Sequence, residues 1–357
     1  KRRAREMGGI EIFGVIGFAV AAYAVVANDS IQTLGTFLSS NAKRPWWMLW
    51  IFASSILVAV IAYGYFKGGG DVAFDRLDKL SVLPGEGDRS GALAPGIQWW
   101  HALPPLVLLA MTRYGIPVST TFLVLTLFAL SGGSSTDGVL QSMLVKSALG
   151  YVVAFFSGVV IWIIISRTFE RWVFDTKEEL PWPYWVIFQW LSTTFLWSQW
   201  LMQDLANIFI YLPRNVAIVG GETHVSFDPA YVIGGTALLV LIQGYIFATR
   251  GGEIQKIVQS KINTVDVRAA TIVDVFYGII LYVFKEMSNI PMSTTWVFLG
   301  LLAGRELAIA YVAQLRNKTE AVRDVLSDAG RAFLGLIISI LLAFAMPFIG
   351  TGRLPGL

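Results

Sequence analysis

The chain has 357 residues, of which 55% are hydrophobic and 14% are charged, against about 25% charged residues in ordinary soluble domains. This composition excludes an ordinary soluble domain and predicts an all-α polytopic membrane protein. The net charge is only +3, and the basic residues lie at the amino end and in connecting segments, which indicates membrane orientation and not nucleic-acid binding. The absence of cysteine excludes disulfides, thiolate metal sites and cysteine nucleophiles.

Apolar segments of about 20 residues mark the expected membrane-spanning helices. In chain order they lie at 10–38, 46–66, 141–165, 184–212, 230–249, 271–284 continuing to 290–304, and 332–349. The first half has a matching broken pair at 98–112 and 116–131. Residues 1–27 also fit a signal peptide, but we favour a spanning helix because equally membranous sequence occurs in the second half.

An acidic motif interrupts the first apolar segment and recurs in the second half of the chain. The first copy comprises Asn28, Asp29 and Gln32, and the second comprises Gln203, Asp204 and Asn207. The two aspartates are 175 positions apart, from 29 to 204. A carboxylate costs roughly 2.5–3.5 kcal/mol or more at a bilayer centre, so both aspartates are expected to have a partner and a purpose.

A hydroxyl-rich motif, Pro-x-Ser-Thr-Thr, also occurs twice, at residues 117–121 and 291–295. Its hydroxyl side chains are Ser119, Thr120, Thr121, Ser293, Thr294 and Thr295. The two copies are 174 positions apart, from 119 to 293, which is nearly the offset of the aspartates. Two motifs in the same order at the same offset predict a tandem of two related halves.

The predicted organisation is a first membrane repeat at 1–166, a charged linker at 167–182 and a second membrane repeat at 183–357. Internal duplication is typical of secondary transporters, with sites near the bilayer midplane where the repeats meet. Each half has about five crossings if the broken segments cross, and about three if they re-enter. Both counts are odd, so we expect two inverted repeats with broken or re-entrant helices meeting at the midplane.

The two motifs offer opposite kinds of binding group. Proline, serine and threonine favour helix starts, where free N–H groups and hydroxyls can hold an oxyanion. The acidic motifs supply oxygen ligands suited to Na⁺, or a carboxylate that carries H⁺. The alternatives are that the hydroxyls only cap or pack membrane helices, and that the aspartates pair with lysine or arginine for structure.

Other polar residues carry weaker expectations. Asp274 and Glu286 have no first-half equivalents and are expected to pair with arginine or lysine. Arg305 and Glu306 are expected near a helix end, with the charge reaching toward the interface. His101 follows two tryptophans and is expected at the membrane interface.

Together, the two acidic motifs and the two Pro-x-Ser-Thr-Thr copies resemble the inorganic phosphate transporter (PiT) family, whose members are cation-coupled symporters with an inverted repeat. The resemblance implies cation binding at Asn28, Asp29, Asp204 and Asn207, and anion binding by the six hydroxyl side chains. The chain departs from the family pattern in having Phe122 and Trp296 where histidine usually follows Ser-Thr-Thr. It also has Gln32 and Gln203 where the family has asparagine.

We therefore expect a transporter and not an enzyme: a symporter, coupled to Na⁺ or H⁺, for a small tetrahedral oxyanion, with phosphate preferred. A sulfate or other oxyanion permease is the alternative, followed by an anion channel and by an intramembrane enzyme in which Asp29 and Asp204 act as acid and base. No cofactor is expected beyond the transported cation, with Na⁺ placed at the two aspartates. Expected partners are phosphate or a similar oxyanion and membrane lipid, without nucleic acid, and a homodimer is left open. The expected location is a bacterial or archaeal plasma membrane.

Overall fold

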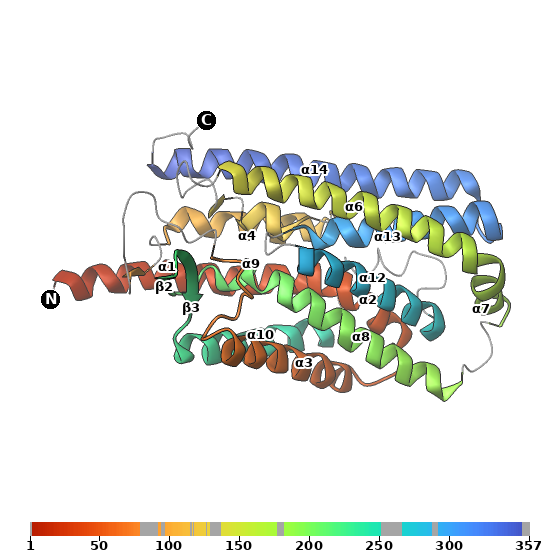
Figure 1. The fold of residues 1–357 in the computed structure, drawn as a ribbon, viewed down its shortest axis with the longest axis horizontal. Coiled ribbons are helices and arrows are strands. Elements are labelled where there is room, and N and C mark those ends of the chain that lie inside the picture. Colours follow the sequence, from red (N-terminus) through yellow and green to blue (C-terminus); the bar gives the residue numbers. More distant parts are fainter. Residues whose placement is uncertain are drawn as a thin grey trace.

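The structure is a bundle of long helices with one small sheet (Figure 1). It is a computed structural model that describes residues 2–78, 92–93, 97–114, 116, 118–125, 127–128, 137–176, 182–250, 266–287 and 292–351. The helices of the first half are α1 (Arg2–Val25), α2 (Ile31–Ser40), α3 (Trp46–Lys67), α4 (Leu103–Arg113), α6 (Asp137–Ile165) and α7 (Arg171–Asp175). Those of the second half are α8 (Pro183–Asp204), α9 (Ala206–Phe209), α10 (Pro229–Ala248), α12 (Val267–Met287), α13 (Thr294–Ala308) and α14 (Lys318–Thr351).

Shorter irregular turns connect or interrupt these helices. The π-helical turns are η1 (Val26–Ser30), η3 (Thr121–Leu125), η4 (Ser166–Glu170) and η5 (Ile309–Ala313), and η2 (Trp99–Ala102) is a 3₁₀ turn. Because η1 joins α1 to α2 without a break in the chain direction, the first apolar segment forms one long helix with an irregular turn in its middle. Such π turns frequently occur at functional sites.

Seven helical stretches in the described residues are long and apolar enough to cross a membrane. They are Ile12–Ser40, Trp46–Lys67, Gln141–Asp175, Pro229–Ala248, Val267–Met287, Thr294–Ala313 and Lys318–Gly350. Large apolar side chains on their outer faces, such as Phe66, Ile164 and Ile233, are exposed, as lipid-facing groups are. The chain is an all-α polytopic membrane protein, as its composition predicted.

The broken pair expected at 271–284 and 290–304 forms two separate helices, α12 of 21 residues and α13 of 15 residues. The span expected at 184–212 ends earlier, because α8 gives way to the short α9 at Leu205. The chain then enters a hairpin of β2 (Asn215–Val219) and β3 (Glu222–Ser226).

This hairpin and β1 (Ala92–Leu93) form a three-stranded antiparallel sheet in the order β1-β2-β3. Gly220 and Gly221 join β2 to β3 with φ of 63° and 89°. Positive φ at both central residues gives the turn whose twist matches a two-residue hairpin, and glycine adopts it without steric cost.

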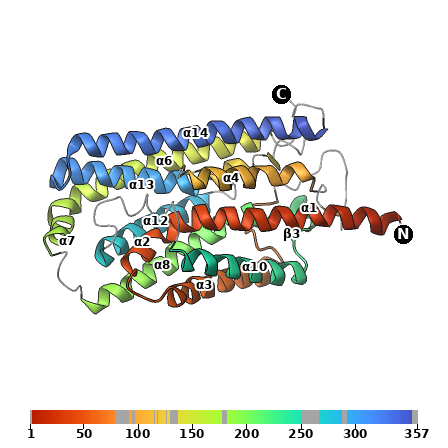
Figure 2. The same ribbon diagram turned by 180° about the vertical axis from the view of Figure 1, so that it is seen from behind.

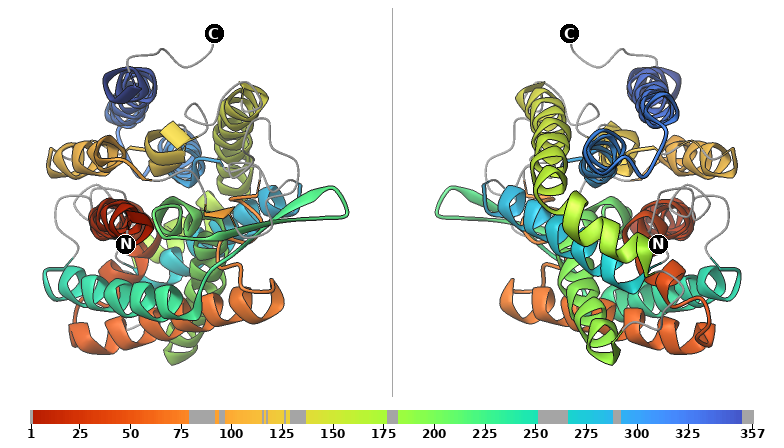
Figure 3. Two further views of the ribbon diagram at one scale, coloured as in Figure 1. Left: turned by 90° about the vertical axis from the view of Figure 1, so that its left-hand side faces the viewer. Right: turned by 90° about the vertical axis from the view of Figure 1, so that its right-hand side faces the viewer.

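Helices α4, α12 and α13 each cover only part of the molecule's long dimension. α4 occupies one half, while α12 and α13 occupy the other, and the view from behind gives the same arrangement (Figures 1 and 2). Seen along the long axis, the first and second halves of the chain overlap near the centre (Figure 3), where Thr121 at the start of η3 donates to the backbone oxygen of Met292, two residues before α13, at 3.0 Å. The segments just before η3 and α13 therefore meet in the interior.

Glycine permits a close crossing of α6 and α13, which belong to different predicted halves. A Cβ built on Gly304 would lie 2.1 Å from the backbone oxygen of Phe155, and one on Gly158 would lie 2.5 Å from that of Leu301. Backbones approach this closely only where side chains are absent, which is typical of helix packing in membranes. This crossing fixes α13 against the first half of the chain.

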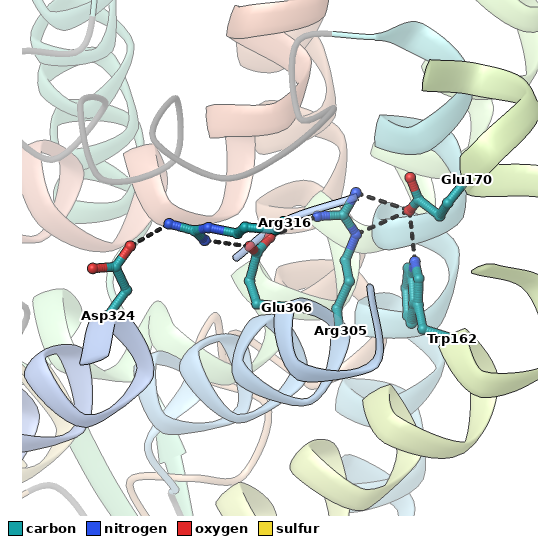
Figure 4. A network of polar contacts seen from close by, with 6 residues as sticks. All are labelled: Trp162, Glu170, Arg305, Glu306, Arg316 and Asp324. Atoms are coloured by element: carbon teal, nitrogen blue, oxygen red, sulfur yellow. Dashed lines mark hydrogen bonds and ion pairs between the residues drawn. The ribbon is translucent and has the colours of Figure 1, made fainter. Parts of the chain in front are cut away.

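A buried network of charges ties the end of α6 to α13 and α14. It comprises Trp162, Glu170, Arg305, Glu306, Arg316 and Asp324 (Figure 4). The Arg305 guanidinium donates to Glu170 Oε1 at 2.8 Å and to Glu306 Oε1 at 3.1 Å. Arg316 continues the network to Asp324 on α14. Arg305 and Glu306 are thus buried in ion pairs and do not reach toward the interface.

Candidate functional site

The two aspartates of the acidic motifs lie at irregular points in their helices. Asp29 sits in the π turn η1, and Asp204 is the last residue of α8. Both side chains are buried, with 1% and 0% of their surface exposed. The sequence prediction of two carboxylates inside the apolar part of the protein therefore matches their positions.

The two Ser-Thr-Thr segments meet and exchange equivalent hydrogen bonds. The Thr121 hydroxyl donates to the backbone oxygen of Met292 at 3.0 Å, and the Thr295 hydroxyl donates to that of Val118 at 3.3 Å. Donors and acceptors in the two bonds are related by the same shift of 174 positions, from 121 to 295 and from 118 to 292. Pro117 and Pro291, which the motif also includes, lie outside the described residues.

Hydroxyls from both segments also reach the two acids. Thr120 donates to Asp29 Oδ2 at 2.5 Å, and the Thr295 hydroxyl, whose single hydrogen is shared with Val118 O, lies 3.2 Å from Asp29 Oδ1. Thr121 lies 3.4 Å from Asp204 Oδ1. The contacts of Thr295 with Asp29 and of Thr121 with Asp204 are again equivalent between the halves, and each joins one half's hydroxyl to the other half's acid.

Amide side chains complete the surroundings of the acids. Asn28 Nδ2 donates to Asp29 Oδ1 and to Val118 O, both at 2.8 Å. Asn207 Nδ2 donates to Asp204 Oδ1 at 2.7 Å and to the Thr120 hydroxyl at 2.8 Å. Because Thr120 in turn donates to Asp29, one chain of hydrogen bonds connects the two acids.

Several buried oxygens in this region lack a hydrogen-bond donor among the described residues. They are Gln32 Oε1, Gln203 Oε1, Asp204 Oδ2 and Asn207 Oδ1. A buried acceptor without a partner costs about 1–3 kcal/mol. Such oxygens next to carboxylates are suitable ligands for a hard cation, and they belong to the motifs in which cation binding is predicted.

The two hydroxyl motifs begin different kinds of helix. Ser293 caps α13, accepting from Trp296 N at 3.2 Å, as the motif predicts. Ser119 makes the same contact with Phe122 N at 3.3 Å, and the described residues that follow it are helical: Thr120, the π turn η3, and residues 127–128. Each copy therefore begins a helical segment, irregular in the first half of the chain and regular in the second. Phe122 and Trp296 lie against each other, with ring centroids 5.6 Å apart.

Arg76 is a buried residue near the site that the sequence did not single out. Its Nε donates to the backbone oxygen of Met202 at 3.0 Å. Burial lowers the pKa of its guanidinium to about 10, while the charge of Asp204 acts in the opposite direction. Arg76 comes from a polar loop with several charges, so no pattern distinguished it from a solvated residue.

The remaining polar residues were predicted with mixed success. Glu286 pairs with Lys285 at 2.8 Å, as expected. Asp274 does not pair with a basic residue, because its partners are the hydroxyls of two threonines. His101 is not at an exposed interface position: it is buried and stacked on Trp100 at a centroid separation of 3.7 Å.

Comparison with known proteins gives one structural likeness. No protein-family model matches the sequence, and no curated protein matches it. A solved structure titled "The sodium-dependent phosphate transporter" is similar over 97% of this chain and 100% of its own, with a TM-score of 0.55 and 15% sequence identity. The chain has the fold of that structure. At this identity the likeness extends to the fold alone.

Proposed function

We propose that the protein is a cation-coupled symporter for a small tetrahedral oxyanion, most favourably inorganic phosphate. The observation that carries this proposal is the crossed contact between the halves, in which Thr121 reaches Asp204 and Thr295 reaches Asp29. One buried place thus holds hydroxyl donors for an anion and carboxylates for a cation. The shared fold with a sodium-dependent phosphate transporter and the motif resemblance support the same function.

The cation site in this proposal is formed by the two acidic motifs. Its side chains are Asn28, Asp29, Gln32, Gln203, Asp204 and Asn207. They offer two carboxylates and amide oxygens, several of which are buried without a donor. This set of oxygens is suited to Na⁺, and either carboxylate could carry H⁺ instead.

The oxyanion site is formed by the six hydroxyls of the Ser-Thr-Thr copies, together with free N–H groups at the start of α13. In the described structure, Thr120 and Thr295 donate to Asp29. The same hydroxyls would turn toward an anion, since a hydroxyl hydrogen can rotate to another acceptor.

Coupling follows from charge. Two like charges 4 Å apart repel by about 4 kcal/mol at an effective dielectric constant of 20. An oxyanion beside two ionised carboxylates would therefore bind poorly until a cation neutralises them. The cation gradient would thus drive uptake of the anion because binding of the two ions is mutually dependent.

Alternating access would use the two halves as inverted repeats that rock about this site. The placement of α4 in one half of the long dimension and of α12 and α13 in the other supports this arrangement (Figure 1). The equivalent hydrogen bonds between positions 174 apart support the duplication itself.

Uptake of labelled phosphate by proteoliposomes tests the proposal, with unlabelled sulfate as competitor, in Na⁺ and in Na⁺-free buffer. Saturable uptake that depends on a cation gradient is expected. Asp29→Asn and Asp204→Asn should each abolish uptake, while Asp175→Asn, at an exposed position, should leave it unchanged. Uptake that is linear in substrate and independent of any cation would indicate a channel. Near-normal uptake in both aspartate variants would remove the cation site.

A further inference from the structure

A third buried aspartate lies outside the site described above. Asp274, near the start of α12, has 0% of its surface exposed. Its Oδ1 accepts a hydrogen bond from the Thr36 hydroxyl on α2, and its Oδ2 accepts one from the Thr193 hydroxyl on α8, both at 2.6 Å. Three helices from both halves of the chain therefore meet at one carboxyl group.

No positive charge compensates Asp274 in the described part of the chain. α2 carries no ionisable side chain. Besides Asp274, α12 and the other helices packed against it carry a small set of described ionisable side chains. These are Arg268, Tyr277, Tyr282, Lys285 and Glu286 on α12, Tyr184 and Asp204 on α8, Lys146 and Tyr151 on α6, and Arg305 and Glu306 on α13. Arg268, the nearest cation along α12, is already paired with Asp266 at 2.7 Å.

The partners of Asp274 differ in kind from those of Glu170, the buried acid of the charge network. Glu170 accepts from Arg305 and from Trp162 Nε1, two groups that can only donate (Figure 4). A threonine hydroxyl can donate or accept. If Asp274 is protonated, its O–H can donate to a threonine, whose own proton can turn to a helix carbonyl four residues earlier.

A metal cation does not fit this place. The two oxygen–oxygen separations of 2.6 Å are hydrogen-bond lengths and leave no room for an ion between the carboxylate and the hydroxyls. A proton needs no such room. The two threonine hydroxyls can donate to the ionised carboxylate and can accept from the neutral carboxyl. A group that gains and loses a proton requires partners of this kind.

A column of polar side chains leads from Asp274 to one end of the molecule. Thr193 accepts from Gln189 Nε2 at 3.3 Å, and Gln189 Oε1 accepts from Asn41 Nδ2 at 2.9 Å. Asn41 follows α2 and accepts from Arg44 Nε at 3.0 Å, in the partly exposed turn between α2 and α3. α8 begins and α2 ends at this same end of the molecule (Figure 1).

We propose that Asp274 is a proton-binding site, separate from the cation site at Asp29 and Asp204, which exchanges its proton with the end of the molecule where α2 leads into α3. One turn further along α12, the Tyr277 hydroxyl donates to the backbone oxygen of Thr294 at 3.1 Å, so the same helix contacts the oxyanion motif. Proton binding stands on this geometry alone. The further role of this proton, in coupling to transport of the oxyanion, rests on the proposed function.

Infrared spectra of the full-length protein in lipid nanodiscs test proton binding without any transport. They are recorded from about pH 5 to about pH 9, around the range in which carboxyl groups with buried environments titrate. The wild type should show a protonated-carboxyl band that fades as the pH rises. Part of that band should be missing at low pH in Asp274→Asn, and Asp175→Asn should retain all of it.

Two results would overturn the proposal. In the first, the protonated-carboxyl band has the same intensity in wild type and Asp274→Asn at every pH, which means that Asp274 stays ionised. In the second, the difference in band intensity between the two proteins is the same at every pH, which means that Asp274 stays protonated. If Asp274→Asn does not fold, Thr193→Val provides a second test. It should raise the pH midpoint at which the protonated-carboxyl band fades, because the ionised form of Asp274 loses a hydrogen-bond donor. Thr193→Ser should restore the wild-type midpoint. An unchanged midpoint in Thr193→Val would contradict the assignment.

Phosphate uptake across the same pH range tests the coupling role. Asp274→Asn, which resembles the neutral carboxyl, should flatten the pH profile of uptake while its Na⁺ dependence remains. An unaltered profile would overturn the coupling role. If the wild type carries no oxyanion at all, the proposed function fails, and the infrared titration still decides whether Asp274 binds a proton.

Discussion

Thr121 and Thr295 each donate a hydroxyl hydrogen to the backbone oxygen three residues before the other, at 3.0 and 3.3 Å. The two threonines therefore hold the two Ser-Thr-Thr segments together by a reciprocal pair of bonds. Each also faces the acid of the opposite half, Asp204 for Thr121 and Asp29 for Thr295. Any movement of one half relative to the other must alter both pairs of contacts together.

The reciprocal bonds predict similar effects from equivalent substitutions. Thr121→Val and Thr295→Val each remove one crossed bond, so each should lower the free energy of unfolding by about 0.5–1.5 kcal/mol, since Met292 O loses its bond from Thr121 and Val118 O keeps its bond from Asn28 only. Thermal unfolding in detergent measures this. Uptake should fall in both variants, and Thr121→Ser and Thr295→Ser should restore it. A large effect in only one valine variant would contradict the equivalence of the two halves.

The charge network of Figure 4 predicts strong coupling between Arg305 and Glu170. Arg305→Met should destabilise the protein by about 3–5 kcal/mol, because the buried acids Glu170 and Glu306 each lose an ion pair, although Glu306 keeps its pair with Arg316. Adding Glu170→Gln should recover part of this loss, since one of those acids then becomes neutral. Chemical unfolding of the two single variants and the double variant gives the interaction energy. Additive losses would show that the pair is not coupled.

The glycine crossing of α6 and α13 predicts a position-specific effect of a single methyl group. Gly304→Ala should destabilise the protein by about 1–3 kcal/mol, because the added Cβ meets the backbone oxygen of Phe155. Gly234→Ala on α10 is the matched control, as its Cβ would meet nothing within 4 Å. It should be neutral or slightly stabilising. Equal melting temperatures for the two variants would argue against the close crossing.

One buried and one half-buried acid in the loop after α3 predict a pH dependence of stability. Burial raises the pKa of Asp71 to about 6, and burial together with the charges of Asp71 and Asp75 raises that of Asp78 to about 7. In the unfolded chain both titrate near about 3.9. At a pH between the unfolded and the folded pKa values, the folded protein binds more protons than the unfolded one. The stabilisation that these two carboxyls contribute is therefore complete below about pH 4 and is lost as the pH rises through about 6 to 7.

Melting temperatures of wild type and Asp78→Asn over that pH range measure the effect. The wild type should become less stable as the pH rises, and the asparagine variant should show a smaller slope. Asp175→Asn, which changes an exposed carboxylate, should keep the wild-type slope. Parallel slopes in wild type and Asp78→Asn would contradict the raised pKa of Asp78.

Much of the fold could be predicted because burial in a membrane leaves a strong record in composition. The long apolar segments and the placement of Asp29 and Asp204 inside them were visible for this reason. The 174-residue offset of the hydroxyl motifs also predicted two related halves whose Ser-Thr-Thr segments meet, and Thr121 and Thr295 each bond to the other segment. The roles of these residues in binding remain predictions.

Other features left no local pattern. The partner of Asp274 was expected to be basic, yet two threonines from distant helices supply it, and only tertiary structure brings them together. Burial of Arg76 depends on how its loop packs beneath Met202.

The most direct test of the central claim is equilibrium binding of labelled phosphate to the purified protein, measured across Na⁺ concentration at fixed pH and across pH at fixed Na⁺. Phosphate should bind at least about tenfold more tightly in the presence of the coupling cation, and the cation should bind more tightly by the same factor in the presence of phosphate. Asp29→Asn and Asp204→Asn should each remove that dependence. Phosphate affinity that is the same with and without either cation, and unchanged in both variants, would contradict a shared site for the two ions.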